Sequence, residues 1–216
     1  MFSGQVEFEP SGQNSKSQTL CQRFEYRGCD FELRSLELDD APELFARVDT
    51  NRTRLRQWLP WLDDTQTEAD ASRFILRMQA RAEKNQGFAV LICHAGAIAG
   101  VIDLQSINWN NRTASIGYWI DQSHEGKGLI TRAAKAIVIY AFTTLELNRI
   151  EILCATQNTR SQAVPQRLGF AYEGTLRQSL CLYGDFIDHE LYAMLKQDWQ
   201  NRIGKQDWAS LKQDYL

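Results

Sequence analysis

The segment 129–144 constrains the fold most strongly, because its pattern is that of a helix with an unusually wide apolar surface. Two adjoining helix faces are apolar, formed by Leu129, Ala133, Ile137 and Tyr140 on one side and by Ile130, Ala134 and Val138 on the other. A helix with such a surface is stable in water only when another element covers both faces. The segment therefore predicts a helix that packs against a β-sheet.

The sheet itself is predicted from the runs around this helix. Residues 87–96, 97–107 and 112–120 are rich in β-forming residues and are separated by turn signals, which predicts an antiparallel meander. Further strands are predicted over 148–156, 171–180 and 185–195, and helices over 65–85 and 161–170. A strand and helix before the meander complete an α/β fold, with a mixed sheet of substantial antiparallel content and helices on its faces.

The ends of the chain differ from this middle part. Residues 1–28 are rich in Gly, Ser and Gln and lack periodicity, so they are interpreted as an N-terminal extension. Residues 200–216 are predicted to be a helical tail, with Trp208, Leu211 and Tyr215 at helical spacing. One domain is expected between them, over 29–199.

Composition excludes several classes of function. A net charge of −3 argues against broad binding to nucleic acid or to an anionic membrane. The longest apolar run, 136–142, is too short to span a bilayer, and the N-terminus is polar and acidic, unlike a signal peptide. Five cysteines without a C-x-x-C motif indicate free thiols. A cytoplasmic protein is therefore expected.

Gly126 and Gly128 directly precede the apolar helix, although glycine weakens helices. Free backbone N–H groups and the positive end of the helix dipole meet at a helix N-terminus, where they bind anions. The two glycines therefore indicate a loop that closes on a phosphate. The alternative is a tight turn into the helix with no ligand.

Five short segments carry a resemblance to a known family. They are LRQWLPWLD (55–63), IGYWID (116–121), GKGLITRA (126–133), NTRSQAVPQRLGF (158–170) and YGDFIDHELYAML (183–195). In this order they resemble the GNAT superfamily of N-acetyltransferases, and in particular its ribosomal-protein-serine/alanine N-acetyltransferase branch, over about residues 24–199. The resemblance implies a GNAT fold, with a mostly antiparallel sheet of about seven strands that splays between its fourth and fifth strands.

The resemblance also implies acetyl-CoA as co-substrate, without a metal. The residues it assigns to acetyl-CoA binding are Tyr118, Trp119, Ile120, Glu125, Gly126, Lys127, Gly128, Leu129, Ile130, Thr131, Asn158 and Ser161. The backbone N–H groups of residues 126–131 would hold the pyrophosphate, and those near Trp119 and Ile120 would face the thioester carbonyl. Glu125 replaces the usual Gln or Arg and is expected to point to solvent.

Ser161 is the candidate proton donor to the leaving thiolate, and Asn158 the candidate partner of the pantetheine arm, both by resemblance. Their alternative role is to cap the helix that starts there. Pro165 removes the helical N–H partner of the Ser161 carbonyl. Pro165 also occupies the position at which many family members carry a tyrosine acid, which favours Ser161 as the acid.

Two positions, Ser115 and Asp103, bear on the general base. The branch often has Glu where this chain has Ser115, and serine cannot replace a carboxylate as a base, although it could hold a water. Asp103 lies in an apolar run and is the candidate substitute; the alternative is a solvent-facing strand residue. An α-amine is far more often neutral near pH 7 than a lysine, so a weak base favours an N-terminal α-amine as acceptor.

The remaining assignments concern the acceptor. Trp58, Pro60 and Trp61 form either the acceptor-side wall or part of the core, and Tyr183 and His189 are candidates to approach the same groove. A row of arginines is either a solvated helix face or a contact for an acidic partner; its members are Arg73, Arg77 and Arg81. The three histidines are too scattered for a metal site.

The predicted function is transfer of an acetyl group from acetyl-CoA to a primary amine, foremost the N-terminal α-amine of a protein such as a ribosomal protein. The alternatives are a small amine (a polyamine, an amino acid or an antibiotic) as acceptor, or a degenerate acyl-CoA-binding module. The sequence leaves open whether a homodimer forms and whether residues 1–28 and the tail mediate it.

Overall fold

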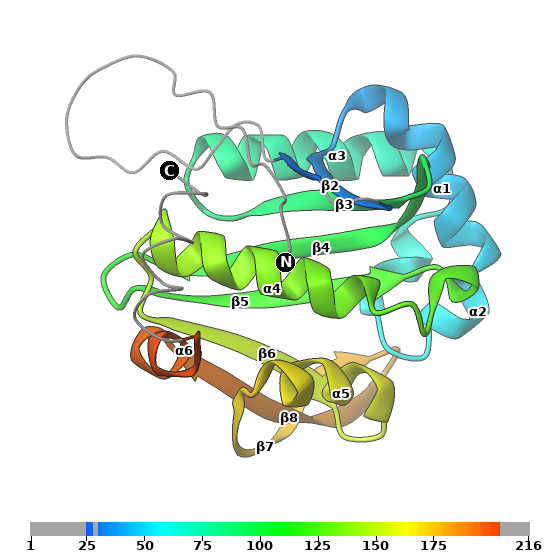
Figure 1. Cartoon of the computed structure of the whole chain (residues 1–216). Coiled ribbons are helices and arrows are strands. Elements are labelled where there is room, and N and C mark those ends of the chain that lie inside the picture. Colours follow the sequence, from blue (N-terminus) through cyan, green and yellow to red (C-terminus); the bar gives the residue numbers. More distant parts are fainter. Residues whose placement is uncertain (1–24, 28–29, 204–216) are drawn as a thin grey trace.

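The computed structural model describes residues 25–27 and 30–203, which form an eight-stranded sheet flanked by helices (Figure 1). The spatial order of the strands is β1-β2-β3-β4-β5-β6-β8-β7. Their bounds are β1 Glu25–Arg27, β2 Phe31–Ser35, β3 Phe88–His94, β4 Ala97–Asn108, β5 Thr113–Ile120, β6 Arg149–Ala155, β7 Ala171–Leu182 and β8 Asp185–Leu195. The predicted mixed sheet is confirmed: β5 and β6 are parallel and every other neighbouring pair is antiparallel.

The short strand β1 lies at the end of the segment interpreted as an extension, where it pairs with β2 at the edge of the sheet. The predictions for Cys21, Cys29 and the tail around Trp208 fall outside the described residues. Cys93, Cys154 and Cys181 carry free thiols, as predicted. Within residues 25–27 and 30–203 the structure contains no helix of the length and apolar character that crossing a membrane requires.

Six α-helices accompany the sheet in the described part of the chain. They are α1 Ala41–Thr50, α2 Arg52–Leu55, α3 Glu68–Glu83, α4 Leu129–Thr143, α5 Thr159–Leu168 and α6 Lys196–Ile203, with the 3₁₀ turns η1 Leu38–Asp40, η2 Pro60–Asp64 and η3 Gln122–His124. Sequence signals fix their ends: Thr67 and Asp70 form a capping box at the start of α3, and Gly169 ends α5 in a left-handed conformation.

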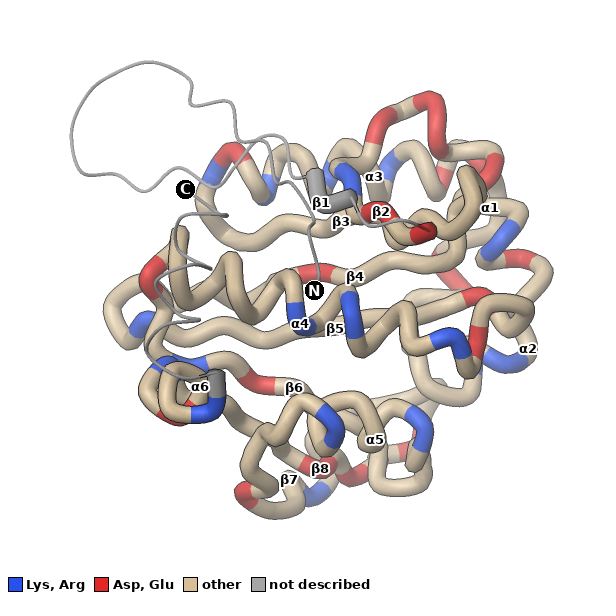
Figure 2. Tube along the Cα trace, in the orientation of Figure 1, with Lys and Arg blue, Asp and Glu red and all other residues tan. Residues whose placement is uncertain are grey.

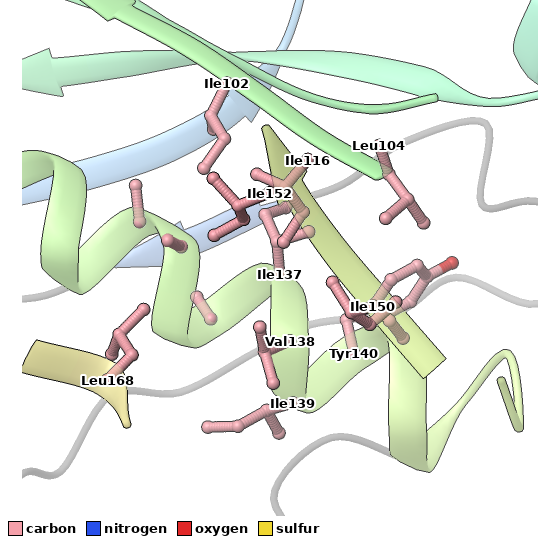
Figure 3. Close-up of a cluster of buried hydrophobic side chains, with 14 of the residues drawn as sticks. Ile102, Leu104, Ile116, Ile137, Val138, Ile139, Tyr140, Ile150, Ile152 and Leu168 are labelled. Carbon is pink, nitrogen blue, oxygen red and sulfur yellow. The ribbon is translucent and has the colours of Figure 1, made fainter. Parts of the chain in front are cut away.

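The helix α4 covers one face of the sheet, as its apolar pattern predicts. Its side chains meet those of β4, β5 and β6 in a buried cluster that includes Ile102, Ile116, Ile137 and Ile152 (Figure 3). Burying each of these side chains contributes roughly 1.5–3 kcal/mol. This core holds the first turn of α4 in place beside the sheet.

The opposite face of the sheet packs against α1, α2 and α3. Because side chains alternate along a strand, Val101 and Trp119 lie on this face and pack with Leu44 and Ile75 in a second buried cluster. Asp103 is two residues after Val101 on β4, and Ser115 is four residues before Trp119 on β5, so each lies on the same face of the sheet as its neighbour. Asp103 and Ser115 therefore lie on the side of the sheet that α3 covers.

The sheet splits at its parallel pair. β5 and β6 are paired only from Thr113 to Ser115 and from Arg149 to Glu151, so residues 116–120 and 152–155 lie apart. The predicted splay between the fourth and fifth family strands is confirmed at this point. The split opens a gap in the middle of the sheet, with α4 and α5 beside it (Figure 1).

Candidate active site

A cleft of about 2160 Å³ runs through the split in the sheet. Small-molecule sites usually have volumes of about 300–1,000 Å³, so this cleft has room for two ligands that meet inside it. One side is lined by the start of α4 and by α5, and the other by α2, η2 and α3. The sequence assigned the residues of the first side to acetyl-CoA and those of the second side to the acceptor, and this assignment remains a prediction.

The glycine loop lines the first side. Gly126 and Gly128 have φ angles of +75° and +73°, which favour glycine, and Gly128 is the N-cap of α4. A Cβ added at either position would meet no heavy atom of the chain within 4 Å, because both face open space. Gly128 has no side chain to cap the first N–H groups of α4, and no side chain in the described part of the chain accepts from them, so they can bind an anion. The tight turn and the phosphate-binding loop, given as alternatives from the sequence, are therefore one structure, and its open backbone fits a pyrophosphate.

The neighbours of these glycines differ in what they can offer. Lys127 and Thr131 line the cleft with their side chains at least partly exposed, so they can contact a phosphate. The side chains of Leu129 and Ile130 are buried in the core against the sheet. These two residues can therefore contribute only their backbone N–H groups.

Glu125 does not point to solvent, and the expectation that it would is wrong. Its carboxylate accepts hydrogen bonds from Arg54 Nη1 at 2.6 Å and from Arg160 Nη1 at 2.5 Å. Arg54 comes from α2 and also donates to the Ile120 carbonyl, whereas Arg160 comes from α5. Two guanidiniums neutralise the carboxylate, which explains how a glutamate can stand beside a pyrophosphate loop.

The backbone of Ile120 faces the gap, whereas that of Trp119 faces β4. The Ile120 carbonyl accepts from Arg54, and the next N–H, that of Asp121, donates to the Ala99 carbonyl at 2.7 Å. Since backbone groups alternate between the two edges of a strand, Trp119 presents its own groups to β4. Its side chain is 9% exposed and belongs to the second core cluster. Of these two residues, only Ile120 has its N–H on the side of the cleft.

Ser161 lies in a cluster of hydrogen-bonding groups at the gap. Its Oγ donates to the Tyr118 hydroxyl at 3.2 Å and lies 3.2 Å from Cys154 Sγ. The Tyr118 hydroxyl in turn donates to the Ser161 carbonyl at 2.9 Å. Burial raises the pKa of both the Tyr118 phenol and the Cys154 thiol, so both groups are neutral and protonated near pH 7.

Pro165 explains why this cluster forms. A proline at this position leaves the Ser161 carbonyl without a helical N–H partner, and Tyr118 satisfies it from β5. Asn158 caps the same helix, since its Oδ1 accepts from the Ser161 N–H at 3.1 Å. The capping role proposed as the alternative is thus confirmed for Asn158. That Cys154 joins the cluster was not predicted, because nothing in an apolar strand marks which side faces the gap.

Asp103 is half-buried and faces the cleft instead of the outer surface, so the alternative of a solvent-facing strand residue is wrong. Its Oδ1 has no hydrogen-bond partner in the described part of the chain. Burial raises the pKa of Asp103 to about 6, against the opposing effects of a hydrogen bond from the Gly117 backbone and the charge of Arg81. A Cβ at position 117 would lie 2.5 Å from Asp103 Oδ1, so Gly117 makes room for the carboxylate.

Asp103 and Ser115 both line the cleft on its acceptor side. Asp103 is placed opposite Gly117 in the strand register, and Ser115 opposite Gln105. A carboxylate with a pKa near 6 is ionised at neutral pH and is strong enough to accept a proton from an amine. Its catalytic role remains a prediction.

The predicted acceptor wall forms the opposite rim. Trp58 and Pro60 line the cleft, whereas Trp61 both lines it and packs partly against the second core cluster. Tyr183 fastens the β7–β8 hairpin to this wall, because its hydroxyl donates to the Leu59 carbonyl at 2.7 Å. The Arg56 guanidinium lies 3.7 Å from the centre of the Tyr183 ring.

Two of the three histidines, which are far apart in the sequence, lie close together in the structure. The rings of His94 and His124 lie 5.4 Å apart, whereas His189 lines the acceptor side and bonds to Ser179. Among the residues that the structure describes, no group of three or more His, Cys, Asp or Glu side chains could hold a metal ion.

The split between β5 and β6 and the glycine-led start of α4, which meet at one cleft, favour an acyltransferase that uses an acyl-CoA. The model of the acetyltransferase (GNAT) domain matches residues 30–171. The chain belongs to this family, and it is an acetyl-CoA-dependent N-acetyltransferase.

Two relatives and one solved structure illustrate the relationship. YdaF of Bacillus subtilis (strain 168), named provisionally as a ribosomal N-acetyltransferase, is 38% identical over 78% of this chain and 92% of its own. The ribosomal-protein-serine acetyltransferase of Escherichia coli (strain K12) is 32% identical over 76% of this chain and 92% of its own. The structure of RimL, a ribosomal L7/L12 α-N-protein acetyltransferase in complex with coenzyme A, has a TM-score of 0.76 and 27% identity, covering 79% of this chain and 97% of that one.

Proposed function

We propose that this N-acetyltransferase acts on the N-terminal α-amine of a protein, with a ribosomal protein as the candidate acceptor. The observation that carries the proposal is the buried Asp103 carboxylate with a pKa of about 6. The pKa of an α-ammonium group, about 7.7–8.0, is about two units higher, whereas that of lysine is more than four units higher. Such a base is well matched to an α-amine and poorly matched to a lysine. Relatives named for ribosomal-protein acetylation support the same acceptor class.

Acetyl-CoA supplies the acetyl group as a thioester. The N–H groups at the start of α4, with Lys127 and Thr131, would hold its diphosphate, and the Ile120 N–H would face its carbonyl oxygen. Asp103 would accept a proton from the acceptor amine on the other side of the cleft. Ser161 would give a proton to the departing sulfur, held in place by Tyr118 and by the Asn158 cap.

A peptide assay tests this proposal. One peptide carries a free N-terminus and an internal lysine, a second is identical but Nα-blocked, and small amines form the third group. Mass spectrometry then locates the acetyl group. We expect transfer to the free α-amine and little to the blocked peptide. Transfer to small amines alone would favour the alternative enzyme, and tight acetyl-CoA binding without any transfer would favour a binding module.

A further inference from the structure

The arginine row on α3 faces the acceptor side of the cleft. Arg73, Arg77 and Arg81 are spaced four residues apart and all three line the cleft (Figure 2 shows Lys and Arg positions along α3 in blue). Four residues of α-helix advance about 6 Å, so the three backbone positions follow one another at about that interval along the helix axis. The solvated-face alternative is therefore incomplete, because these residues belong to the wall of the site.

Two of these arginines make no ion-pair contact within the described residues, although the charge of Arg81 opposes the burial that raises the pKa of the nearby Asp103. Arg77 lies 5.6 Å from the centre of the Phe74 ring, and Arg81 donates to the Gln86 carbonyl at 3.2 Å. In the part of the chain that the structure describes, neither forms an ion pair with an Asp or Glu.

Arg73 does pair with Asp70, but this carboxylate is already engaged in capping α3. It accepts hydrogen bonds from the backbone N–H groups of Gln66 and Thr67 at 2.9 and 2.8 Å. The Arg73 side chain is still 69% exposed. A second carboxylate could therefore bind Arg73 from the cleft side.

The sheet below the row adds little negative charge. Gln105 and Ser115 are neutral and line the cleft beneath α3, and Asp103 lies at the Arg81 end. Asp64, another carboxylate of the acceptor side, belongs to η2, outside α3. Between these two ends the wall carries the positive charge of Arg77.

The spacing of the row suits an extended peptide. Each residue of an extended chain advances about 3.3 Å, so side chains on one face recur at about 6.6 Å. A peptide whose α-amine lies at Asp103 would therefore carry every second side chain past one of the arginines. A polyamine in the same position would place ammonium groups there instead, which is repulsive.

We propose that Arg73, Arg77 and Arg81 form a subsite for carboxylate side chains of the acceptor, which is a polypeptide with acidic residues close behind its N-terminus. The proposal rests on the proposed function, because it describes the residues that follow the acetylated α-amine. The subsite selects acidic N-termini over neutral and basic ones and excludes polyamines.

Three peptides that differ only at every second position after the first test the proposal. These positions carry Asp in one peptide, Asn in the second and Lys in the third. We expect kcat/KM at low salt to be at least about tenfold higher for the Asp peptide than for the Asn peptide, and lowest for the Lys peptide, since each exposed ion pair contributes a few-fold. The preference should fall towards parity at about 0.5 M salt, where charges are screened.

Variants then identify the residue responsible. Arg77→Gln should lower the Asp-to-Asn ratio about threefold or more, and Arg77→Glu should favour the Lys peptide. Lys135→Gln is the matched control, because Lys135 is exposed on α4 outside the cleft lining. Acetyl-CoA affinity, measured by calorimetry, reports whether each variant is folded.

Two outcomes overturn the proposal without touching the proposed function. These are equal kcat/KM for the three peptides in the wild type, and an acidic preference that persists in Arg77→Glu. The proposed function fails separately, if no peptide is acetylated at its N-terminus while small amines are.

Discussion

Replacing Asp103 with asparagine tests the candidate base, because it should change stability and catalysis in opposite directions. The carboxylate has a pKa of about 6 in the folded protein, against 3.8 for the ordinary side chain. Between these two pH values the native state holds a proton that the unfolded chain has released. The free energy of unfolding therefore decreases as the pH rises through this window.

The magnitude follows from the two pKa values. About two pKa units correspond to about 3 kcal/mol, which is the cost of keeping the buried carboxylate ionised above pH 6. Asparagine has nearly the same shape and no charge. Asp103→Asn should therefore raise the free energy of unfolding by up to about 3 kcal/mol at pH 7.5 and by little at pH 4.

Catalysis should respond in the other direction. With Asp103 as base, log(kcat/KM) of the wild type should bend near pH 6 and again near the acceptor's own pKa of about 8. Asp103→Asn should lose the bend near pH 6 and about 10²-fold or more of the activity between pH 6 and 8. Acetyl-CoA affinity should stay the same.

Urea denaturation at pH 4 and pH 7.5 measures the first effect, and acetyl transfer to one peptide from pH 5 to 9 measures the second. Asp185→Asn is the control, because Asp185 is exposed at the start of β8 outside the cleft lining. A bend near pH 6 that survives in Asp103→Asn would refute the assignment of the base. A stability gain that is equal at both pH values would refute the electrostatic account.

Four further substitutions test the rest of the site. Gly128→Val should weaken acetyl-CoA binding at least about tenfold, measured by calorimetry. It should also lower the free energy of unfolding by about 1 kcal/mol or more, because residue 128 has a φ of +73°. Gly96→Val is the control, since Gly96 has a φ of +81° in a turn outside the cleft, and it should show only the loss of stability. Ser161→Ala should lower kcat modestly with little change in KM for acetyl-CoA, because the thiolate of a thiol with a pKa of about 8.5 can leave without full protonation. If kcat is unchanged while the chemical step is rate-limiting, Ser161 only caps the helix. Tyr118→Phe should lower kcat when it is made in the wild type, but should lower it little further when it is made in Ser161→Ala. If the two losses add in the double variant, Tyr118 does not act through Ser161. Ser115→Glu should raise activity more at pH 6.5–7 than at pH 9, and an equal gain at both pH values would exclude a role as base.

The parts of the fold that the sequence predicted depend on short-range patterns. The apolar faces of α4 are periodic within a few residues, and β3, β4 and β5 are runs of β-forming residues separated by turn signals, so the packing of α4 on the sheet followed from them. Gly126 and Gly128 were recognisable because two glycines separated by one residue, directly before an apolar helix, indicate a close approach of the backbone to a ligand or a tight turn. The extra edge strand β1 was missed because three residues are too few to show a period.

The parts of the site that were missed depend on contacts across the chain. Glu125 meets Arg54 and Arg160, which are 71 and 35 residues away, and no local pattern pairs them. Pro165 indicated a carbonyl without a partner, but only the fold shows that Tyr118 satisfies it. The burial of Asp103 depends likewise on the register that places Gly117 opposite it.

The bridge from Arg54 through Glu125 to Arg160 has a consequence for how affinity arises. It ties the pyrophosphate loop to α2 and α5 by hydrogen bonds of 2.6 and 2.5 Å that need no ligand. A flexible loop would lose conformational entropy on closing around a phosphate, which costs about 1–2 kcal/mol for each backbone residue that becomes ordered. Here folding has already ordered the loop. More of the attraction between the phosphate and the start of α4 is therefore expressed as affinity for acetyl-CoA.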